Sequence, residues 1–202
     1  MGMVKDMDCL TPRLLNIIFF VFSALIALAF LMKNQVAQIA NPLTLSVAYL
    51  GIILLERYTI FKLKSYIRVV LIVTFLSHSL FGEYFRAYYT TGWFDNGLHL
   101  FGSFSFALFS YELLSTFISI SSSKPKTLTF LLVSLLGICL GTFFELIEFS
   151  LDQLLHEHNQ FGLIDTDLDL VFDVIGSLLA GLFVVKKNLL KELCGTLRRL
   201  LS

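Results

Sequence analysis

Charged side chains are scarce in this sequence. Only 15% of its 202 residues are Asp, Glu, Lys or Arg, whereas a soluble domain usually carries about 25%. Such a chain has too little polar surface to cover a water-soluble globule. Acids and bases number 15 each, so the net charge gives no indication of a nucleic-acid partner. The composition therefore excludes an ordinary soluble domain and favours the lipid bilayer as solvent.

Cysteine is also rare. The three cysteines are Cys9, Cys139 and Cys194. No two of them have the spacing of a disulfide framework or a zinc knuckle. We expect three unpaired thiols.

Apolar residues make up 56% of the chain and gather in long runs. Most of these runs approach the roughly 20 residues that cross the bilayer as helix. The sequence therefore predicts an all-α fold, a polytopic transmembrane bundle with six spans in a single membrane domain over residues 1–202. The expected spans are Leu14–Met32, Pro42–Phe61, Tyr66–Phe81, Gly97–Ile118, Leu128–Leu151 and Leu168–Val185. Asn41, as a capping side chain before Pro42, predicts the start of the second helix.

The positions of the bases predict the orientation. If the N-terminus is cytoplasmic, 13 of the 15 bases fall on the cytoplasmic side and only Lys33 and Arg86 fall outside. This split follows the positive-inside rule and supports six spans with both termini in the cytoplasm.

The acids follow the opposite pattern. Ten of the 15 acids lie outside or in the outer halves of spans, namely Glu83, Asp95, Glu145, Glu148, Asp152, Glu157, Asp165, Asp167, Asp169 and Asp173. All four histidines, His78, His99, His156 and His158, lie on that side too. Orientation rules ignore acids to first order, so this gathering needs another cause.

Helical spacing groups these polar residues into stripes. Asp95 and His99 are four residues apart and share one face of the fourth helix. The other two stripes are Glu145, Glu148 and Asp152 on the fifth helix, and Asp165, Asp169 and Asp173 on the sixth. Small residues continue the stripes inward and predict close packing of these three helices, with His99, Glu145 and Asp173 near one another.

The depth of the carboxylates indicates a chemical role. Asp173 is 13 residues before Lys186, or about 20 Å along a helix, which places it within the membrane. Ionised acids at that depth cost several kcal/mol unless they are paired, protonated or liganded. A divalent metal ion bound by His99, Asp95, Asp169 and Asp173 would balance the charge. Protons shared among the acids would also do so.

Several of these residues also fit structural roles. Asp165 and Asp167 are well placed to cap a helix N-terminus, and residues 166–169 resemble a capping box. His156, Glu157 and His158 fit a solvated loop, and His78 fits a hydrogen-bonded packing residue. The aromatic residues between the third and fourth helices fit an interfacial belt.

Three ordered motifs resemble the YjdF-like bacterial inner-membrane proteins. They are Phe94-Asp95 followed by His99, then residues 144–149 (FELIEF), then residues 165–169 (DTDLD). The resemblance covers roughly residues 70–185, and the order of the motifs is also distantly similar to VanZ-type membrane proteins. It implies a multi-pass protein of the bacterial cytoplasmic membrane with these site residues, and it names no reaction. Loop 153–164 is shorter than the family pattern, and Asp167-Leu168 replaces a Gln-Trp pair.

Three functions fit these observations. The first is a metal-dependent enzyme acting on a lipid or lipid-linked substrate at the outer leaflet, with Glu145 or Glu148 as general base. The second is a proton-coupled transporter that uses the carboxylates as a relay. The third is a non-catalytic membrane protein whose polar cluster is structural or binds a partner. Membrane lipid is the one partner that the sequence indicates.

Overall fold

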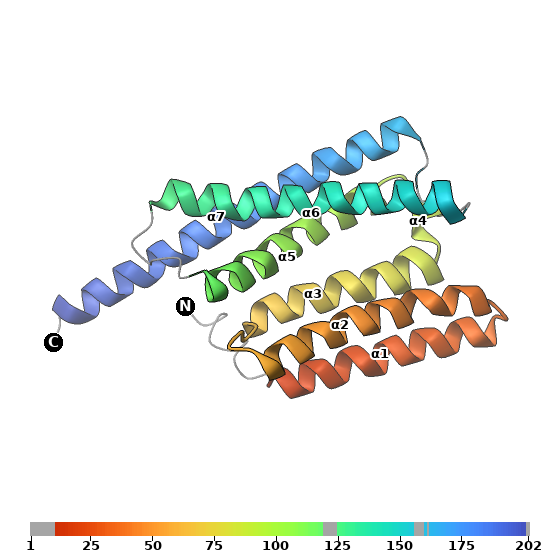
Figure 1. Ribbon diagram of the computed structural model, residues 1–202, viewed down its shortest axis with the longest axis horizontal. Coiled ribbons are helices and arrows are strands. Elements are labelled where there is room, and N and C mark those ends of the chain that lie inside the picture. Colours follow the sequence, from red (N-terminus) through yellow and green to blue (C-terminus); the bar gives the residue numbers. More distant parts are fainter. Residues whose placement is uncertain (1–10, 119–124, 156–159, 161, 201–202) are drawn as a thin grey trace. The chain divides into compact units, whose positions relative to one another are not determined.

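The chain folds into helices connected by short segments (Figure 1). The structure is a computed structural model that describes residues 11–118, 125–155, 160 and 162–200, with side chains described as far as residue 189. The helices are α1 (Pro12–Met32), η2 (Val36–Ile39), α2 (Ala40–Tyr58), α3 (Ser65–Ser77), η3 (His78–Tyr84), α4 (Ala87–Thr90), α5 (Phe94–Phe117), α6 (Lys126–Leu155) and α7 (Leu163–Leu200). These described ranges contain no strand. The predicted all-α fold is confirmed.

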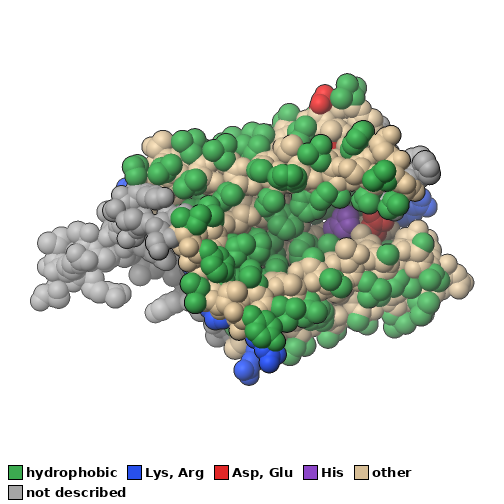
Figure 2. Space-filling view, viewed as in Figure 1, with side chains coloured by type: hydrophobic (Ala, Val, Ile, Leu, Met, Phe, Trp, Pro, Cys, Tyr) green, Lys and Arg blue, Asp and Glu red, His purple; other side chains and the backbone are tan. Residues whose placement is uncertain are grey.

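Six helical segments are long and apolar enough to cross a membrane, as predicted. They are Pro12–Met32, Val36–Tyr58, Ser65–Tyr84, Phe94–Phe117, Lys126–Leu155 and Leu163–Leu189. Many large apolar side chains on these segments are exposed, including Ile17, Val47 and Leu135. Figure 2 shows hydrophobic side chains spread over the visible face, with few charged ones among them. A surface of this kind is matched to hydrocarbon rather than to water.

Two of the six spans begin five or six residues earlier than the sequence predicted, and the other four begin one to three residues earlier. Helix α7 begins at Leu163, five residues earlier than expected, because Gly162 adopts φ +122° and accepts a hydrogen bond from the Thr166 amide. That φ favours glycine. Asp165 therefore lies within the first turn of α7, not ahead of the helix, and the capping-box interpretation of residues 166–169 is wrong.

The second span also begins earlier, with η2 leading directly into α2. Asn41 consequently lies inside the helical segment, and the residue that precedes α2, Ile39, provides no side-chain cap. The Asn41 side chain instead bonds to two residues of η3, as described below.

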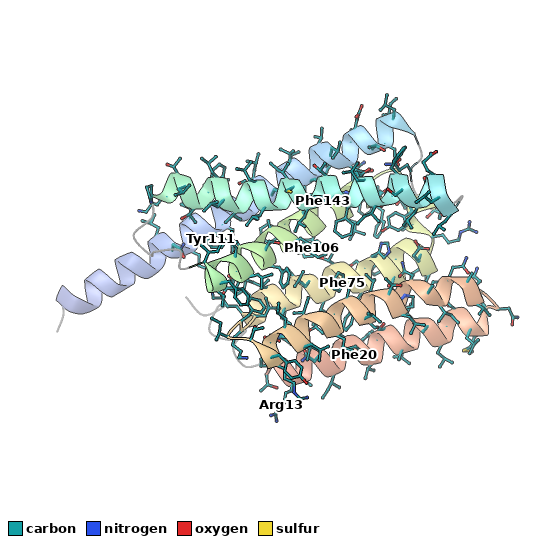
Figure 3. All side chains as sticks on the ribbon, in the orientation of Figure 1. Arg13, Phe20, Phe75, Phe106, Tyr111 and Phe143 are labelled. Atoms are coloured by element: carbon teal, nitrogen blue, oxygen red, sulfur yellow. The ribbon has the colours of Figure 1, made fainter. Side chains whose placement is uncertain are left out.

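The chain divides into two compact units, residues 1–98 and 99–202. In unit 1, helices α1, α2 and α3 pack through buried aromatic and aliphatic side chains. Phe19 of α1 lies 4.2 Å from Tyr49 of α2 and 6.2 Å from Phe75 of α3, measured between ring centroids. Figure 3 labels Phe75 on α3 and Phe20 on α1, whose ring lies 5.9 Å from that of Tyr49.

A buried guanidinium group joins α1, α2 and α3 in unit 1. Arg68 of α3 is fully buried and binds both oxygens of Glu56 at the end of α2, at 2.7 and 2.6 Å. Its Nη1 donates to Asn16 Oδ1 of α1 at 2.7 Å and to the Tyr49 hydroxyl at 3.3 Å. Glu56 Oε1 also accepts from the Leu63 amide at 2.8 Å. These bonds fix the α2–α3 connection, and we name Arg68, Glu56, Asn16 and Tyr49 the Arg68 cluster.

A second polar cluster in unit 1 surrounds η3, which is a π-helix. His78 bonds through Nε2 to Asn41 Nδ2 at 2.6 Å and through Nδ1 to the Tyr88 hydroxyl. Ser79 donates to Asn41 Oδ1 at 2.6 Å. His78 is therefore a hydrogen-bonded packing residue, as one interpretation of the sequence predicted, and it ties η3 to α2.

In unit 2, helices α6 and α7 lie side by side (Figure 1) because small residues interlock. Ser177 of α7 rests against Gly137 of α6, and Ser134 of α6 rests against Gly181 of α7. A Cβ on either glycine would overlap the facing side chain. Helix α5 joins this core through Ala107, which also contacts Gly137. The predicted close packing of the last three spans through small residues is confirmed.

Candidate metal centre

Helices α5, α6 and α7 each contribute side chains to one polar cluster. The first turns of α5 carry Asp95 and, one turn further on, His99. Helix α6 contributes Glu145, and α7 contributes Asp169 and Asp173, again one turn apart. Spacing by four keeps each pair on one helix face. We name these five residues the His99 cluster.

Carboxylates face both nitrogens of the His99 ring. Nδ1 lies 3.3 Å from Asp173 Oδ1. On the other side, Nε2 lies 3.7 Å from Glu145 Oε1 and 4.0 Å from Asp169 Oδ1. The structure thus brings His99, Glu145 and Asp173 together, as the helical spacing predicted. Their roles as metal ligands or catalytic groups stay a prediction.

Three of the four carboxylates of this cluster are deeply buried, and Asp95 is half-buried. Exposed fractions are 5% for Glu145, 2% for Asp169 and 3% for Asp173. A single imidazolium carries one positive charge at most, so His99 alone does not balance three ionised acids. Burial of unbalanced charge is costly.

One oxygen of Asp173 lacks a hydrogen bond. Asp173 Oδ2 and Ser177 Oγ, one turn apart on α7, are both buried and have no hydrogen-bond partner among the described residues. A buried polar atom without such a partner costs about 1–3 kcal/mol. Asp173 Oδ2 is therefore suited to bind a cation or a proton.

Asp95, His99 and Asp169 have the arrangement of a ligand set. One ligand atom from each lies within 4.8 Å of the others. Ligand atoms around a tetrahedral ion with bonds of about 2.1 Å are about 3.4 Å apart, so these three side chains would have to move closer together to share an ion. Carboxylate oxygen and imidazole nitrogen suit zinc and manganese among the divalent cations.

Glycines make room for the buried acid. A Cβ built on Gly141 of α6 would overlap the Asp173 carboxylate, with Asp173 Cβ at 2.8 Å. On the adjoining face of α7, Gly176 lies against the Leu100 carbonyl and the Ser103 hydroxyl of α5. These close approaches hold Asp173 between α5 and α6, beside His99.

Gln160 is a site residue that the sequence analysis missed. Its side-chain nitrogen lies 3.2 Å from Glu145 Oε2 and 3.4 Å from the Glu145 carbonyl oxygen. Its backbone amide donates to Asp152 Oδ2 at 3.0 Å. The residue precedes α7 and has no helical periodicity to reveal it. The nearest signal in the sequence was the Glu145–Asp152 stripe on which it docks.

Other candidate residues lie apart from the measured contacts of the cluster. Glu148 and Asp165 are half-buried, Asp167 is exposed, and none of the three belongs to the ligand group. His78 belongs to the η3 cluster of unit 1. His156, Glu157 and His158 lie outside the described residues. Cys139 is a free thiol, as predicted, while the side chains of Cys9 and Cys194 are not among those described.

The fold and the cluster define a class: multi-pass α-helical membrane proteins with a buried histidine–carboxylate centre. The chain belongs to the family described as Predicted membrane protein (DUF2238), whose model matches residues 14–188. This membership confirms the resemblance to the YjdF-like proteins. An uncharacterized protein of Thermotoga maritima is 31% identical over 134 residues, which cover 66% of this chain and 69% of that protein. No solved structure matches the chain.

Proposed function

We propose that the His99 cluster binds a divalent cation and that the protein is a metal-dependent enzyme acting on a lipid or lipid-linked substrate. The observation that carries this proposal is the His99 ring, which has buried carboxylates at both nitrogens. A cation would remove the cost of burying several acids around one imidazole. It would also supply Lewis acidity and an activated water molecule.

The geometry suggests a role for each residue. Asp95, His99 and Asp169 are the expected ligands because their ligand atoms lie together. Asp173 faces His99 through Oδ1, so it can accept the Nδ1 proton and hold the ring in place for a cation at Nε2. Asp173 could itself become a ligand of that cation only by giving up its contact with Nδ1, because the two ring nitrogens point to opposite sides of the imidazole.

Glu145 is the preferred general base. Its Oε1 faces His99 Nε2, while Gln160 binds the other oxygen and so orients the carboxylate. Glu148 lies one turn further along α6 and is the second candidate. A base near a metal-bound water is the usual arrangement for hydrolysis.

The expected location favours a lipid substrate. The cluster lies in the half of the spans that the positive-inside rule assigns to the outer leaflet. Head groups of lipids in that leaflet are the substrates nearest to it. The cytoplasmic membrane of a bacterium, with both termini inside, is the proposed location.

Metal analysis tests the proposal. Protein purified in mild detergent should contain about one divalent ion per chain, and His99→Ala and Asp169→Asn should lose most of it. Asp167→Asn is the matched control, because this exposed acid lies two residues from Asp169 on the same helix. At a cation concentration of 100 times Kd, chelation should remove about 2.7 kcal/mol of stability from the wild type.

A second measurement separates catalysis from binding. Glu145→Gln should keep the ion but abolish metal-dependent turnover of membrane lipids, followed by mass spectrometry of a bacterial lipid extract. Metal-free wild-type protein, or equal metal loss in Asp167→Asn, would contradict the proposed centre.

A further inference from the structure

An apolar groove runs along unit 2 between α5 and α7. Its volume is about 440 Å³. The lining residues from α5 are Leu100, Phe101 and Phe104, and α7 contributes Leu179, Leu182 and Phe183. The rings of Phe104 and Phe183 meet across the two helices at 5.9 Å. This groove is distinct from the seam in which α7 packs on α6.

One end of the groove is basic. Among the described residues of the lining, Lys186 alone is charged, and it lies one turn after Leu182. The ammonium group of the next residue, Lys187, lies 5.8 Å from the centre of the Phe183 ring. Two ammonium groups thus flank the end of a groove that is otherwise apolar. Lysine stems can lie along an apolar surface while their charged ends reach the head-group region.

We propose that this groove binds an anionic phospholipid, with the phosphate at Lys186 and Lys187 and one acyl chain along the groove toward Leu100. The distribution of charge favours this occupant over a protein helix. A phospholipid joins one anionic group to a long apolar chain, which matches a groove that is basic at one end and apolar elsewhere. Basic pockets between transmembrane helices bind anionic head groups in this way.

The helix geometry places the groove along the part of an acyl chain nearest its head group. From Lys186 back to Leu179 the α7 backbone rises about 10 Å, and Leu100 extends the apolar lining beyond that point. A chain anchored at Lys186 would therefore follow α7 from the membrane boundary toward the middle of the bilayer. The basic end of the groove is separate from the proposed cation centre, because Lys186 lies 13 residues, or about 20 Å along α7, from Asp173.

Native mass spectrometry of the purified full-length protein tests the proposal. Dioleoylphosphatidylglycerol and dioleoylphosphatidylcholine are titrated separately, and the wild type should prefer the anionic lipid. Lys186→Gln should reduce this preference about fivefold, which corresponds to roughly 1 kcal/mol for one lysine near the membrane surface. Lys186→Arg, which keeps the charge, should retain the preference.

Two further variants make the test specific. Lys126→Gln removes an exposed lysine at the start of α6, outside the groove, and should leave the preference unchanged. Leu179→Trp narrows the groove and should weaken binding of both lipids. The proposal is overturned if Lys126→Gln lowers the preference as much as Lys186→Gln, or if Lys186→Gln binds the two lipids as the wild type does. Binding unaffected by Leu179→Trp would also overturn it.

Discussion

Arg68 in unit 1 and His99 in unit 2 are basic side chains that face carboxylates from neighbouring helices. Arg68 meets one acid, Glu56, through two bonds of 2.6–2.7 Å, and Asn16 and Tyr49 complete its contacts. His99 faces three acids at 3.3–4.0 Å. One positive and one negative charge balance in the first cluster, whereas a single imidazole faces an excess of carboxylates in the second.

This difference separates a structural cluster from a candidate site. The Arg68 cluster is nearly complete in itself, with only Nε of the guanidinium lacking a hydrogen bond among the described residues. The distances around His99 are longer, at 3.3–4.0 Å, than the 2.6–2.7 Å between Arg68 and Glu56. A balanced ion pair needs no ligand, but a crowded set of acids gains stability from a cation or from protons.

The largest expected effect comes from breaking the balanced pair. Arg68→Met leaves Glu56 without its guanidinium and should cost about 3 kcal/mol of stability, within the 3–5 kcal/mol typical of a broken buried pair. The double variant Arg68→Met/Glu56→Gln removes both charges and should recover much of that loss. Unfolding in mixed micelles, followed by circular dichroism, measures both.

Arg57→Met is the control for that experiment. Arg57 is exposed beside the same helix end, so its loss should change stability by less than about 0.5 kcal/mol. If the double variant is no more stable than Arg68→Met, charge balance does not explain the cluster.

The next prediction concerns the glycine that accommodates Asp173. Gly141→Ala places a Cβ against the Asp173 carboxylate and should cost about 1–3 kcal/mol through overpacking. It should also lower the metal content, because Asp173 must move relative to His99. Thermal stability and elemental analysis of the same sample measure both effects.

Gly51→Ala provides the matched control. Gly51 lies in the interior of α2 and has nothing within 4 Å of an added Cβ. Alanine there should be neutral or stabilising by up to about 1 kcal/mol. A similar loss of metal in both variants would show that Gly141 has no specific link to the centre.

The third prediction concerns Asp169→Asn, which should change stability in opposite directions with and without a bound cation. In chelated protein Asp169→Asn should raise stability by about 1 kcal/mol, because it removes one of several crowded negative charges. In metal-loaded protein the same change should lower stability, because it removes a ligand. Melting temperatures with and without chelator reveal the reversal. An effect of the same sign in both conditions would exclude a bound cation at Asp169.

Much of the fold was predictable because membrane spans are long apolar runs. The six segments and the packing of the last three helices on small residues both follow from sequence spacing. Helix starts were less accurate, since the backbone of Gly162 and the short helix η2 set them rather than hydropathy.

The sequence predicted those site residues that lie on the same helix as another site residue. Asp95 and His99, and likewise Asp169 and Asp173, share a helix face through spacing by four. The Arg68–Glu56 pair was not predicted, because it depends on how α2 and α3 pack across the connection 59–64. Gln160 was missed for the same kind of reason, since its contact with Glu145 arises from the folding of a connecting segment.

The smallest expected effect belongs to Gln160, and it sharpens the contrast between the clusters. Glu56 is held by Arg68 and by the Leu63 amide, whereas Glu145 accepts a bond from the Gln160 side chain at 3.2 Å. Gln160→Ala removes a long hydrogen bond to the Glu145 carboxylate and should cost about 0.5 kcal/mol, the low end for a hydrogen bond, since Gln160 is half-buried. Because Gln160 orients the proposed base and is not an expected ligand, metal content should stay near the wild-type value while turnover falls.

Gln160→Glu should instead place a negative charge beside Glu145 and increase the affinity for the cation. Isothermal titration with Zn²⁺ or Mn²⁺ compares the two variants, and weaker binding by Gln160→Glu than by Gln160→Ala would contradict an electrostatic role for this position.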